Sequence, residues 1–361
     1  MIVGSVSENK DLEKRISITP DIAKKYITNG FQVLLEVGYG SHLGISDDKF
    51  LNEGCKLEKK ENILKQSKIL LQLDLPEEKN LEFLEENKIL IGSFNSSQNL
   101  EKIAKFNSLK TSIFSLELLP RITRAQSMDI LSSQANLAGY KAVVDSFAEF
   151  KKAIPMMMTA AGTISAAKVL VIGAGVAGLQ AIATAKRMGA IVFATDVRMA
   201  SKEQVESLGG KFLDVEGSEN LETEGGYAKE ASEEFKKKQE DLLAETLKKI
   251  DIVICTALIP GKKAPLIIKE KMIDNMISGS VIYDLAASQG GNSAYTKVDE
   301  IVKKKGVTIL GEKNILNKLP VSASNLYAKN LFNFVLNLYD KKNNKLNINT
   351  EDEIINKTLV K

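Results

Sequence analysis

The stretch KVLVIGAGVAGLQAIATAKRMGAIVFATD, which runs from Lys168 to Asp196, decides the fold. It opens with a short apolar run at Val169–Ile172, of the kind that a buried parallel strand shows. A glycine-rich turn follows, and the residues after it predict a helix that ends at Gly189. The apolar run Ile191–Ala194 then predicts a second strand. Strand, turn, helix and strand in this order predict a βαβ unit in a parallel sheet.

The turn in this stretch has the spacing G-x-G-x-x-G. In a dinucleotide-binding unit the first glycine permits the tight turn, the second lets the backbone approach the pyrophosphate, and the third lets helix pack closely on strand. The helix N-terminus adds free N–H groups and the positive end of its dipole. Three packing glycines in an ordinary βαβ unit are the alternative, but the strands, the helix and the terminal aspartate all lie where the binding fingerprint requires them. This end of the predicted site comprises Gly173, Ala174, Gly175, Val176, Gly178, Asp196, Val197 and Arg198.

Asp196 lies about 20 residues beyond the glycines, where a carboxylate accepts hydrogen bonds from the adenosine ribose. A carboxylate there repels a 2′-phosphate, so the sequence predicts NAD(H) in preference to NADP(H). Arg198 would weaken this preference if it pointed inward, and we expect it to point into solvent instead.

Length and composition indicate a globular protein with two domains. The chain has 361 residues, 44% of them hydrophobic and 26% charged, which is more than one ordinary α/β core holds. A net charge of +3 makes no case for nucleic acid as a partner. Cys55 and Cys255 lie far apart beside apolar runs and predict buried, reduced thiols of a cytosolic protein. A single histidine without a cluster of cysteines predicts no metal site.

Neither a secretory signal at Met1 nor a transmembrane segment is expected. Residues 153–185 carry a single charge, that of Lys168, and are long enough to span a bilayer. Pro155, Gly162 and the glycine turn divide them into a loop, a strand and a buried helix. We therefore expect the chain itself to stay out of the membrane.

The N-terminal region alternates apolar runs with helical stretches, which predicts a parallel sheet covered on both faces. Its expected strands are Ile2–Val6, Gln32–Val37, Ile69–Leu73, Ile89–Phe94 and Ile113–Leu116. This region has no glycine fingerprint and so gives no indication of a second nucleotide. The predicted fold class is α/β with two Rossmann-like domains, residues 1–125 plus about 325–361 and residues 126–324. A helix at Leu326–Tyr339 is expected to return to the first domain, and residues 341–361 are expected to form a polar tail or arm.

The second domain, which carries the fingerprint, contains further apolar runs. Its other expected strands are Lys211–Val215, Ile252–Thr256, Val281–Leu285 and Val307–Leu310. Ligands of doubly wound sheets bind beyond the carboxyl ends of strands, so the turns with Ala257, Leu258 and Leu285 are candidates for the nicotinamide end. The polar insert at residues 216–249 holds Gly225-Gly226-Tyr227, which suits either a flap that closes over a ligand or a solvated surface hairpin.

A polar stretch just before the second domain's first helix mixes hydrogen-bond donors and acceptors that suit a carboxamide and a phosphate. These side chains suit a ligand-binding cleft and a plain interdomain connection equally well, and their spacing favours neither. The residues are Arg121, Arg124, Gln126, Asp129 and Ser132.

The scarcity of acid–base groups bears on the reaction. A dehydrogenase that acts on an alcohol or an amino acid moves a proton as well as a hydride, and commonly uses His or Lys to do so. His42 is the only histidine, and we expect an exposed structural role for it. Hydride transfer between two nicotinamides needs no proton donor, only close approach of the rings and exclusion of water. The sequence thus favours a nucleotide-to-nucleotide reaction, while its lysines keep the other reaction open.

Several blocks of the chain resemble one family nearly from end to end. They are RITRAQSMDILSSQANLAGYKAV at 121–143, MTAAGTISAAKVLVIGAGVAGLQAIATAKRMGA at 158–190, TDVR at 195–198, KEQVESLGGKF at 202–212, GGYAKE at 225–230 and TALIPGKKAP at 256–265. In these blocks the chain resembles the soluble NAD(H)-binding component, domain I, of proton-translocating NAD(P) transhydrogenase. The wider superfamily includes alanine dehydrogenase, and the shared N-terminal signature is present as Glu13, Arg15 and Thr19-Pro20.

The resemblance implies roles that the spacing leaves open. Tyr227, with Gly226, matches the mobile loop that closes over the nucleotide, and Asp196 matches the residue that contacts the adenosine ribose. With Tyr227, the expected catalytic set consists of residues matching the loop that holds and orients the nicotinamide of NAD(H), namely Arg121, Gln126, Asp129 and Ser132.

The resemblance also implies partners and a location. The second domain is expected to bind NADH and to pass its hydride to NADP⁺ held on a separate domain III, while a membrane domain II couples this transfer to proton movement. Domains II and III are expected on other polypeptides, and domain I as a homodimer. The chain is expected in the cytoplasm, peripheral on the inner face of the bacterial inner membrane through its partner subunits.

Departures from the superfamily pattern weaken the amino-acid dehydrogenase alternative. Alanine dehydrogenases carry a substrate-binding lysine and a catalytic histidine in the first domain, and LLQLDLP at 70–76 and LIGSFNSSQN at 90–99 contain neither. Arg15 remains, as an expected structural ion-pair partner. LAASQGGN at 285–292 also differs from the acidic version expected in the family. A stand-alone amino-acid dehydrogenase and an NAD-sensing module without redox chemistry are the two alternatives.

Overall fold

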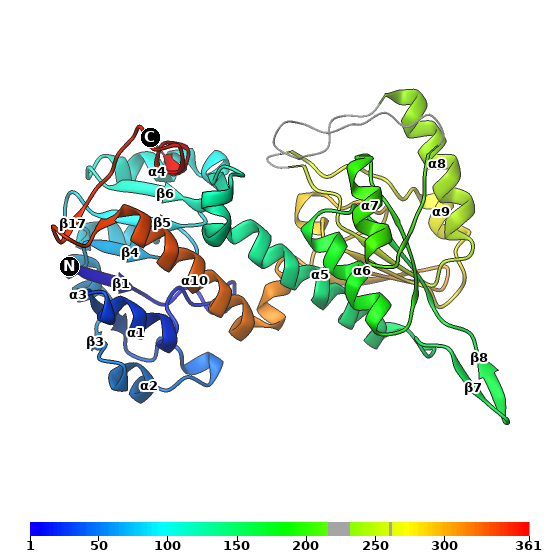
Figure 1. Cartoon of the computed structure of the whole chain (residues 1–361), viewed down its shortest axis with the longest axis horizontal. Coiled ribbons are helices and arrows are strands. Elements are labelled where there is room, and N and C mark those ends of the chain that lie inside the picture. The colour runs from blue at the N-terminus through cyan, green and yellow to red at the C-terminus, as the bar shows by residue number, and fades with distance from the viewer. Residues whose placement is uncertain (216–231, 260–261, 361) are drawn as a thin grey trace. The chain divides into compact units, whose positions relative to one another are not determined.

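The computed structural model describes residues 1–215, 232–259 and 262–360 and divides into two units (Figure 1). Unit 1 comprises Met1–Gln134 and Leu316–Lys361, and unit 2 comprises Ala135–Ile315. The division falls inside the helix α5 (Ile130–Glu149). Each unit is built on a seven-stranded sheet.

The sheet of unit 1 has the strand order β18-β6-β5-β4-β1-β2-β3, with β18 antiparallel to β6 and the other neighbours parallel. Its strands are β1 (Ile2–Ser5), β2 (Gln32–Glu36), β3 (Lys56–Glu58), β4 (Ile69–Leu71), β5 (Ile89–Gly92), β6 (Ser112–Ser115) and β18 (Leu359–Val360). Its helices are α1 (Pro20–Thr28), α2 (Asp47–Asn52), α3 (Lys60–Gln66), α4 (Leu100–Asn107), α10 (Pro320–Leu338) and α11 (Glu353–Thr358). The five strands expected here are confirmed, each somewhat shorter at its carboxyl end.

Apolar side chains cover both faces of this sheet, as a parallel sheet requires. In β4, Ile69 and Leu71 belong to one buried cluster and Leu70 belongs to another, because successive side chains point to opposite faces. The expected returning helix is confirmed as α10, which begins earlier than predicted and lies in the first cluster. Its Phe332 ring lies 4.9 Å from the ring of Tyr26 in α1.

The expected polar tail at residues 341–361 is wrong. A short hairpin of β16 (Tyr339–Asp340) and β17 (Lys345–Leu346) leads into α11, and β18 then pairs with β6. The side chains of Ile354 and Ile355 are buried, and the Asp352 carboxylate caps α11 by accepting hydrogen bonds from both of their N–H groups. A capping aspartate before a single apolar pair is too short a signal for a hydropathy pattern to show.

The sheet of unit 2 has the strand order β11-β10-β9-β12-β13-β15-β14, with β14 antiparallel to β15 and the other neighbours parallel. Its strands are β9 (Lys168–Ile172), β10 (Ile191–Thr195), β11 (Lys211–Phe212), β12 (Ile252–Cys255), β13 (Val281–Asp284), β14 (Glu300–Lys304) and β15 (Val307–Gly311). The helices beside it include α6 (Val176–Arg187), α7 (Ala200–Ser207), α8 (Glu233–Leu247) and α9 (Glu270–Asp274).

The strand order of unit 2 reverses at β9, which lies between β10 and β12. In doubly wound sheets the ligand crevice lies at this reversal, outside the carboxyl ends of the strands. Each strand expected in this unit is confirmed, and the antiparallel β14 is an addition. The side chains of β14 are mostly exposed, so the sequence has no apolar run that would predict this strand. Cys255 in β12 and Cys55 in unit 1 are buried and free, as predicted.

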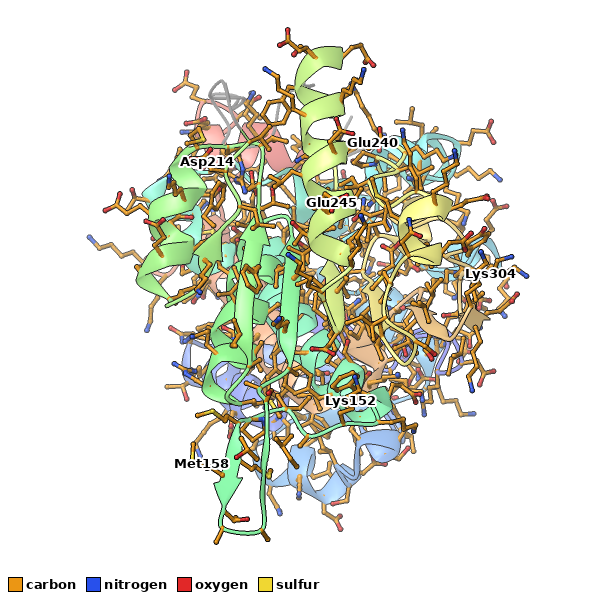
Figure 2. All side chains as sticks on the ribbon, turned by 90° about the vertical axis from the view of Figure 1, so that its right-hand side faces the viewer. Lys152, Met158, Asp214, Glu240, Glu245 and Lys304 are labelled. Atoms are coloured by element: carbon orange, nitrogen blue, oxygen red, sulfur yellow. The ribbon has the colours of Figure 1, made fainter. Side chains whose placement is uncertain are left out.

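A hairpin of β7 (Met157–Thr159) and β8 (Gly162–Ile164) extends away from the rest of unit 2, with Met158 near its end (Figures 1 and 2). All of its strand residues are exposed. The sequence predicts only a loop here, because strands exposed on both faces have no apolar period. Among the described residues, no helix combines the length and the apolar composition that crossing a membrane requires.

Candidate functional site

The glycine turn joins β9 to α6 at the strand reversal of unit 2. Gly173 has φ of +91°, and a Cβ placed on it would lie 2.7 Å from the Thr256 hydroxyl oxygen. That hydroxyl donates a hydrogen bond of 2.9 Å to the Gly173 carbonyl. A Cβ on Gly178 would lie 1.8 Å from the same carbonyl oxygen. The fold itself therefore requires glycine at the first and third positions of the fingerprint.

The middle glycine is different. Gly175 has an ordinary negative φ of −76°, and a Cβ on it would meet no described atom closer than 4.0 Å, the distance to Nη2 of Arg198. Neither backbone strain nor packing against the described residues requires a glycine at this place. Gly175 is also the N-cap of α6 and gives it no side-chain cap, so the first N–H groups of the helix are left for a ligand. The residues present fit a dinucleotide pyrophosphate.

Asp196 follows β10 and lies against the glycine turn. Its Oδ2 accepts a hydrogen bond of 2.7 Å from the Ala174 N–H, and its Oδ1 accepts one of 2.8 Å from the Arg198 N–H. The Arg198 guanidinium donates to both oxygens, from Nε to Oδ1 at 2.9 Å and from Nη2 to Oδ2 at 2.8 Å. The sequence-based expectation that Arg198 points into solvent is wrong. The planar guanidinium matches a carboxylate two residues away, and together they form a bidentate pair.

The loops after β12 and β13 are held together by a buried amide and a buried carboxylate. Asn292 accepts a 3.0 Å hydrogen bond from the Ala257 N–H and donates a 2.8 Å bond to the Ala257 carbonyl. Asp284 accepts from the N–H groups of Asn292 and Ser293 at 2.7 and 3.0 Å, and from the Thr296 hydroxyl at 2.7 Å. Burial raises the pKa of Asp284, and these hydrogen bonds act against the rise.

These contacts place three of the predicted cofactor residues. The Ala257 N–H lies 3.2 Å from where a Cβ on Gly173 would stand, so the β12 loop adjoins the glycine turn. Leu258, the next residue, is exposed, and the Leu285 N–H bonds to the Cys255 carbonyl at 3.0 Å. Sequence reasoning missed Thr256, Asp284 and Asn292. Thr256 and Asp284 are polar residues at the carboxyl ends of their apolar runs, whereas Asn292 lies eight residues beyond the end of β13 and has no such signal.

The side chains of the polar stretch in unit 1 have three different surroundings. Asp129 accepts hydrogen bonds from the Ser132 N–H at 2.8 Å and from the Ser132 hydroxyl at 2.5 Å, at the start of α5. Arg124 forms an ion pair of 2.7 Å with Asp352, ahead of α11. Arg121 and Gln126 are exposed. Gly226 and Tyr227, in the predicted flap, lie outside the described residues.

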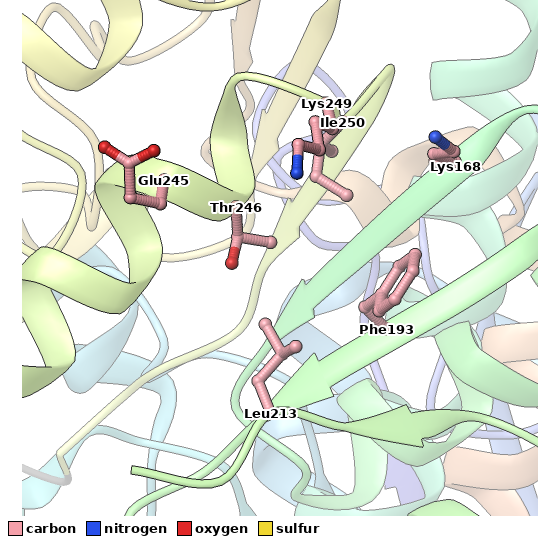
Figure 3. A pocket seen from close by; sticks show the side chains of 7 residues that line it. All are labelled: Lys168, Phe193, Leu213, Glu245, Thr246, Lys249 and Ile250. Carbon is pink, nitrogen blue, oxygen red and sulfur yellow. The ribbon is translucent and has the colours of Figure 1, made fainter. Parts of the chain in front are cut away.

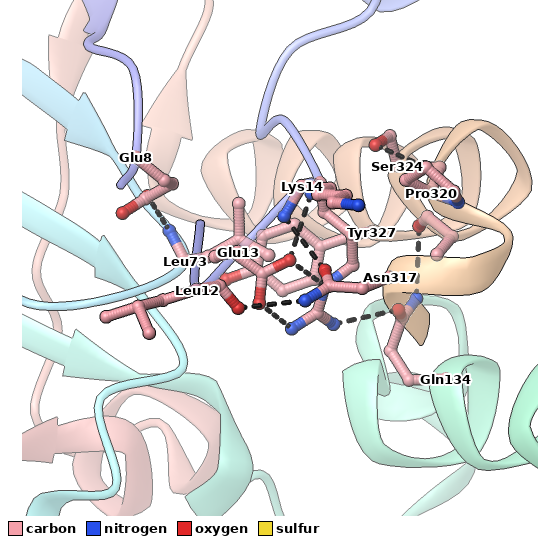
Figure 4. A network of polar contacts seen from close by, with 12 residues as sticks. Glu8, Leu12, Glu13, Lys14, Leu73, Gln134, Asn317, Pro320, Ser324 and Tyr327 are labelled. Carbon is pink, nitrogen blue, oxygen red and sulfur yellow. Dashed lines mark hydrogen bonds and ion pairs between the residues drawn. The ribbon is translucent and has the colours of Figure 1, made fainter. Parts of the chain in front are cut away.

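Unit 1 contains a second polar network, centred on Arg15, whose partners Glu13 and Gln134 are labelled in Figure 4. The guanidinium pairs with Glu13 at 2.8 Å from Nε and 2.7 Å from Nη2, and its Nη1 donates to Gln134 at 2.9 Å. The Arg15 guanidinium also lies 5.8 Å from the centre of the Tyr327 ring. The predicted ion-pair role of Arg15 is therefore confirmed. His42 is exposed and its Nε2 lies 2.8 Å from the Lys14 carbonyl oxygen, which fits the structural role expected for it.

A pocket of about 330 Å³ lies elsewhere in unit 2, between α8 and the sheet (Figure 3). Lys168 at the amino end of β9 and Ile250 just before β12 contribute to it, as does Phe193 from β10. Leu213, which follows the carboxyl end of β11, also lines the pocket, and none of its seven lining residues belongs to the glycine turn. The pocket and the glycine turn are separate features.

Two models of one family match most of the chain. The N-terminal domain of alanine dehydrogenase/PNT matches residues 4–138, and its C-terminal domain matches residues 142–361. The first part of the NAD(P) transhydrogenase alpha subunit of Rhodospirillum rubrum is 46% identical over 368 residues, which cover 100% of this chain and 96% of that protein.

A solved structure and a more distant protein place the chain within this family. The transhydrogenase structure from Sinorhizobium meliloti has a TM-score of 0.89 and 42% identity, and the match covers 99% of this chain and 98% of that one. Alanine dehydrogenase 1 of Staphylococcus aureus is 24% identical over 351 residues, which cover 94% of this chain and 88% of that protein. The chain belongs to the alanine dehydrogenase/PNT family, within its group of NAD(P) transhydrogenase alpha subunits.

Proposed function

We propose that unit 2 binds NAD(H) at its glycine turn, and that the chain passes hydride from NADH to NADP⁺ held by another transhydrogenase subunit. The observation that carries this proposal is the turn itself. The fold does not require a glycine at position 175, and the space that a side chain would fill there is open. This space adjoins the N-terminus of α6, which has no side-chain cap, and the carboxylate of Asp196. The likeness to transhydrogenase subunits along the whole chain supports the choice of reaction.

The roles of the residues follow from what hydride transfer needs. The nicotinamide ring supplies the chemistry, and the protein has to hold the ring, orient it and exclude water. The Thr256-Ala257-Leu258 loop and Leu285 suit the nicotinamide end, because Asn292 and Asp284 fix their backbone. Arg121, Gln126, Asp129 and Ser132 are proposed to orient the carboxamide, and Tyr227 to close over the nucleotide.

The test is oxidation of NADH by an NADP⁺ analogue whose reduced form has a distinct absorption spectrum. The purified chain is assayed with and without a separately prepared NADP(H)-binding transhydrogenase subunit. Turnover is expected only in the mixture, because the two nicotinamides must lie in one complex. Turnover of the chain alone with pyruvate and ammonium, without any in the mixture, would move it to the amino-acid dehydrogenases.

The amino-acid dehydrogenase alternative has less support from unit 1. Arg15 is the group there that would bind a substrate carboxylate, and its guanidinium already bonds to Glu13 and Gln134. The NAD-sensing alternative predicts nucleotide binding without hydride exchange, and the assay described above separates it from the proposed function.

We further propose that two copies form a homodimer through the β7–β8 hairpin, and that other transhydrogenase polypeptides hold the dimer at the inner face of the membrane. An isolated two-stranded hairpin is marginal in water, and this one exposes 70% of Met158 and 47% of Ile164. Burial against a second copy would remove that apolar surface from water. Met158→Lys with Ile164→Lys is expected to convert a dimer into a monomer in analytical ultracentrifugation, and an unchanged mass would contradict the use of the hairpin.

A further inference from the structure

The acceptor positions of the Asp196 carboxylate are all in use. Four donors bond to it at 2.7 to 2.9 Å, namely the Ala174 N–H and the N–H, Nε and Nη2 of Arg198. A carboxylate offers about four lone-pair sites. An adenosine ribose therefore gains a hydrogen bond from Asp196 only when one of these donors leaves.

The guanidinium is the donor that a change of side-chain rotamer can remove. The two backbone N–H groups are fixed by the glycine turn and by the chain that follows β10, whereas a side chain can change rotamer. The Arg198 side chain is 16% exposed and that of Asp196 is 6% exposed, so the arginine is on the outer side of the pair. Its Nη2 also lies 4.0 Å from where a Cβ on Gly175 would stand, within the space left open for a ligand.

We propose that Arg198 competes with the adenosine ribose for Asp196, and that it thereby sets how strongly the site prefers NAD(H) to NADP(H). This inference rests on the proposed nucleotide-binding function. A bare carboxylate at this place favours a ribose with a free 2′-hydroxyl and repels a 2′-phosphate. The bidentate pair neutralises that charge, and a guanidinium displaced from Asp196 stays within reach of a 2′-phosphate. Asp196 supplies the preference for NAD(H), and Arg198 reduces it.

Two substitutions separate the charge of Arg198 from its geometry. Arg198→Gln removes the cation and frees the carboxylate, and Arg198→Lys keeps the cation but loses the bidentate fork. The dissociation constants of NADH and NADPH are measured on the full chain by nucleotide fluorescence, with thermal unfolding as a check that each variant folds. In Arg198→Gln, NADH binding is expected to tighten severalfold and NADPH binding to weaken by about tenfold or more. In Arg198→Lys, NADPH affinity is expected to stay near the wild-type value.

A second background isolates the competition. With Asp196→Asn in place, Arg198→Gln no longer frees a carboxylate and is expected to leave NADH affinity unchanged. Equal weakening of both nucleotides by Arg198→Gln would overturn the inference, because Arg198 would then be a contact common to both. An unchanged ratio of the two affinities would overturn it as well. Failure of the wild-type chain to bind either nucleotide would overturn the proposed function and this inference together, whereas binding with an unchanged ratio overturns the inference alone.

Discussion

The two sheets of this protein differ in the residues that follow the carboxyl end of a central strand. In unit 2 the chain leaves β9 through a turn without side chains, and Gly175 stands beside open space. In unit 1 the chain leaves β1 toward Glu8, whose carboxylate bonds to the Leu73 N–H at 2.7 Å and to the Gln72 side chain at 3.0 Å, near the end of β4. The Ser7 N–H bonds to Glu36 at the end of β2.

A doubly wound sheet provides a crevice, but the crevice alone is not a ligand site. The strand order reverses within each sheet, and the crevice that this reversal forms is where such sheets bind ligands. Unit 1 occupies the region with its own carboxylates and with the Arg15 network, and unit 2 leaves it to a ligand. Function therefore depends on the few residues after one strand, and the fold class alone does not supply it.

Removal of Arg15 is expected to show that the unit 1 network is structural. Arg15→Met leaves the half-buried Glu13 carboxylate without its partner, and should lower the free energy of unfolding by about 3 kcal/mol. NADH affinity should stay within about threefold of the wild-type value, a shift below 1 kcal/mol. Urea unfolding and a fluorescence titration measure the two quantities. The double variant with Glu13→Gln serves as control and should recover part of the lost stability. A large loss of NADH affinity without loss of stability would assign Arg15 to a ligand site.

Filling the open space in unit 2 is expected to have the opposite pattern. Gly175→Val places methyl groups where the pyrophosphate is proposed to lie, and should weaken NADH binding by about a hundredfold while the melting temperature stays unchanged. Gly178→Ala is the contrast, because its Cβ would meet the Gly173 carbonyl at 1.8 Å and should lower the melting temperature. If Gly175→Val binds NADH normally, the turn is not the phosphate site.

The strands of the two units differ in how well the sequence predicts them. The sequence predicts the β9–α6–β10 unit from residues that lie close together, since an apolar run, three glycines and a terminal aspartate lie within 29 residues. The same holds for the other central strands, which are short buried runs. Strand β14 and the β7–β8 hairpin are not predicted, because their residues are mostly exposed and have no apolar pattern. Strand β3 is not predicted because it has three residues, of which only Leu57 is apolar.

Side-chain pairings in the site are harder to predict than strands. Asn292 bonds to Ala257, 35 residues earlier in the chain, and only the sheet order brings the two loops together. The Arg198 pair is local but depends on which way Asp196 faces after β10 ends. A residue type and a spacing restrict what such side chains can do, and the tertiary fold decides which partner each one has.

A titration of Glu8 tests whether the crevice of unit 1 excludes water from this carboxyl group. Burial, opposed by the Leu73 hydrogen bond and aided by the nearby Asp74 carboxylate, raises the pKa of Glu8 from 4.5 to about 8. The folded protein then holds this proton more tightly than the unfolded chain, so the stabilising contribution is complete below pH 4.5 and is lost as the pH rises to about 8. Glu8→Gln keeps an oxygen that can accept both hydrogen bonds and removes the titration.

The expected result is a difference that grows with pH. Urea unfolding at pH 5 should give wild type and Glu8→Gln stabilities that agree within about 1 kcal/mol, and at pH 8.5 the variant should be more stable by about 4 kcal/mol. Burial also raises the pKa of Asp74, and its own desolvation is common to both proteins, whereas its charge interaction with Glu8 is part of the measured difference. Parallel pH profiles would mean that Glu8 is ionised in the folded protein throughout this range. An ionised Glu8 needs water or a cation beside it, so the crevice of unit 1 would then be open, as that of unit 2 is.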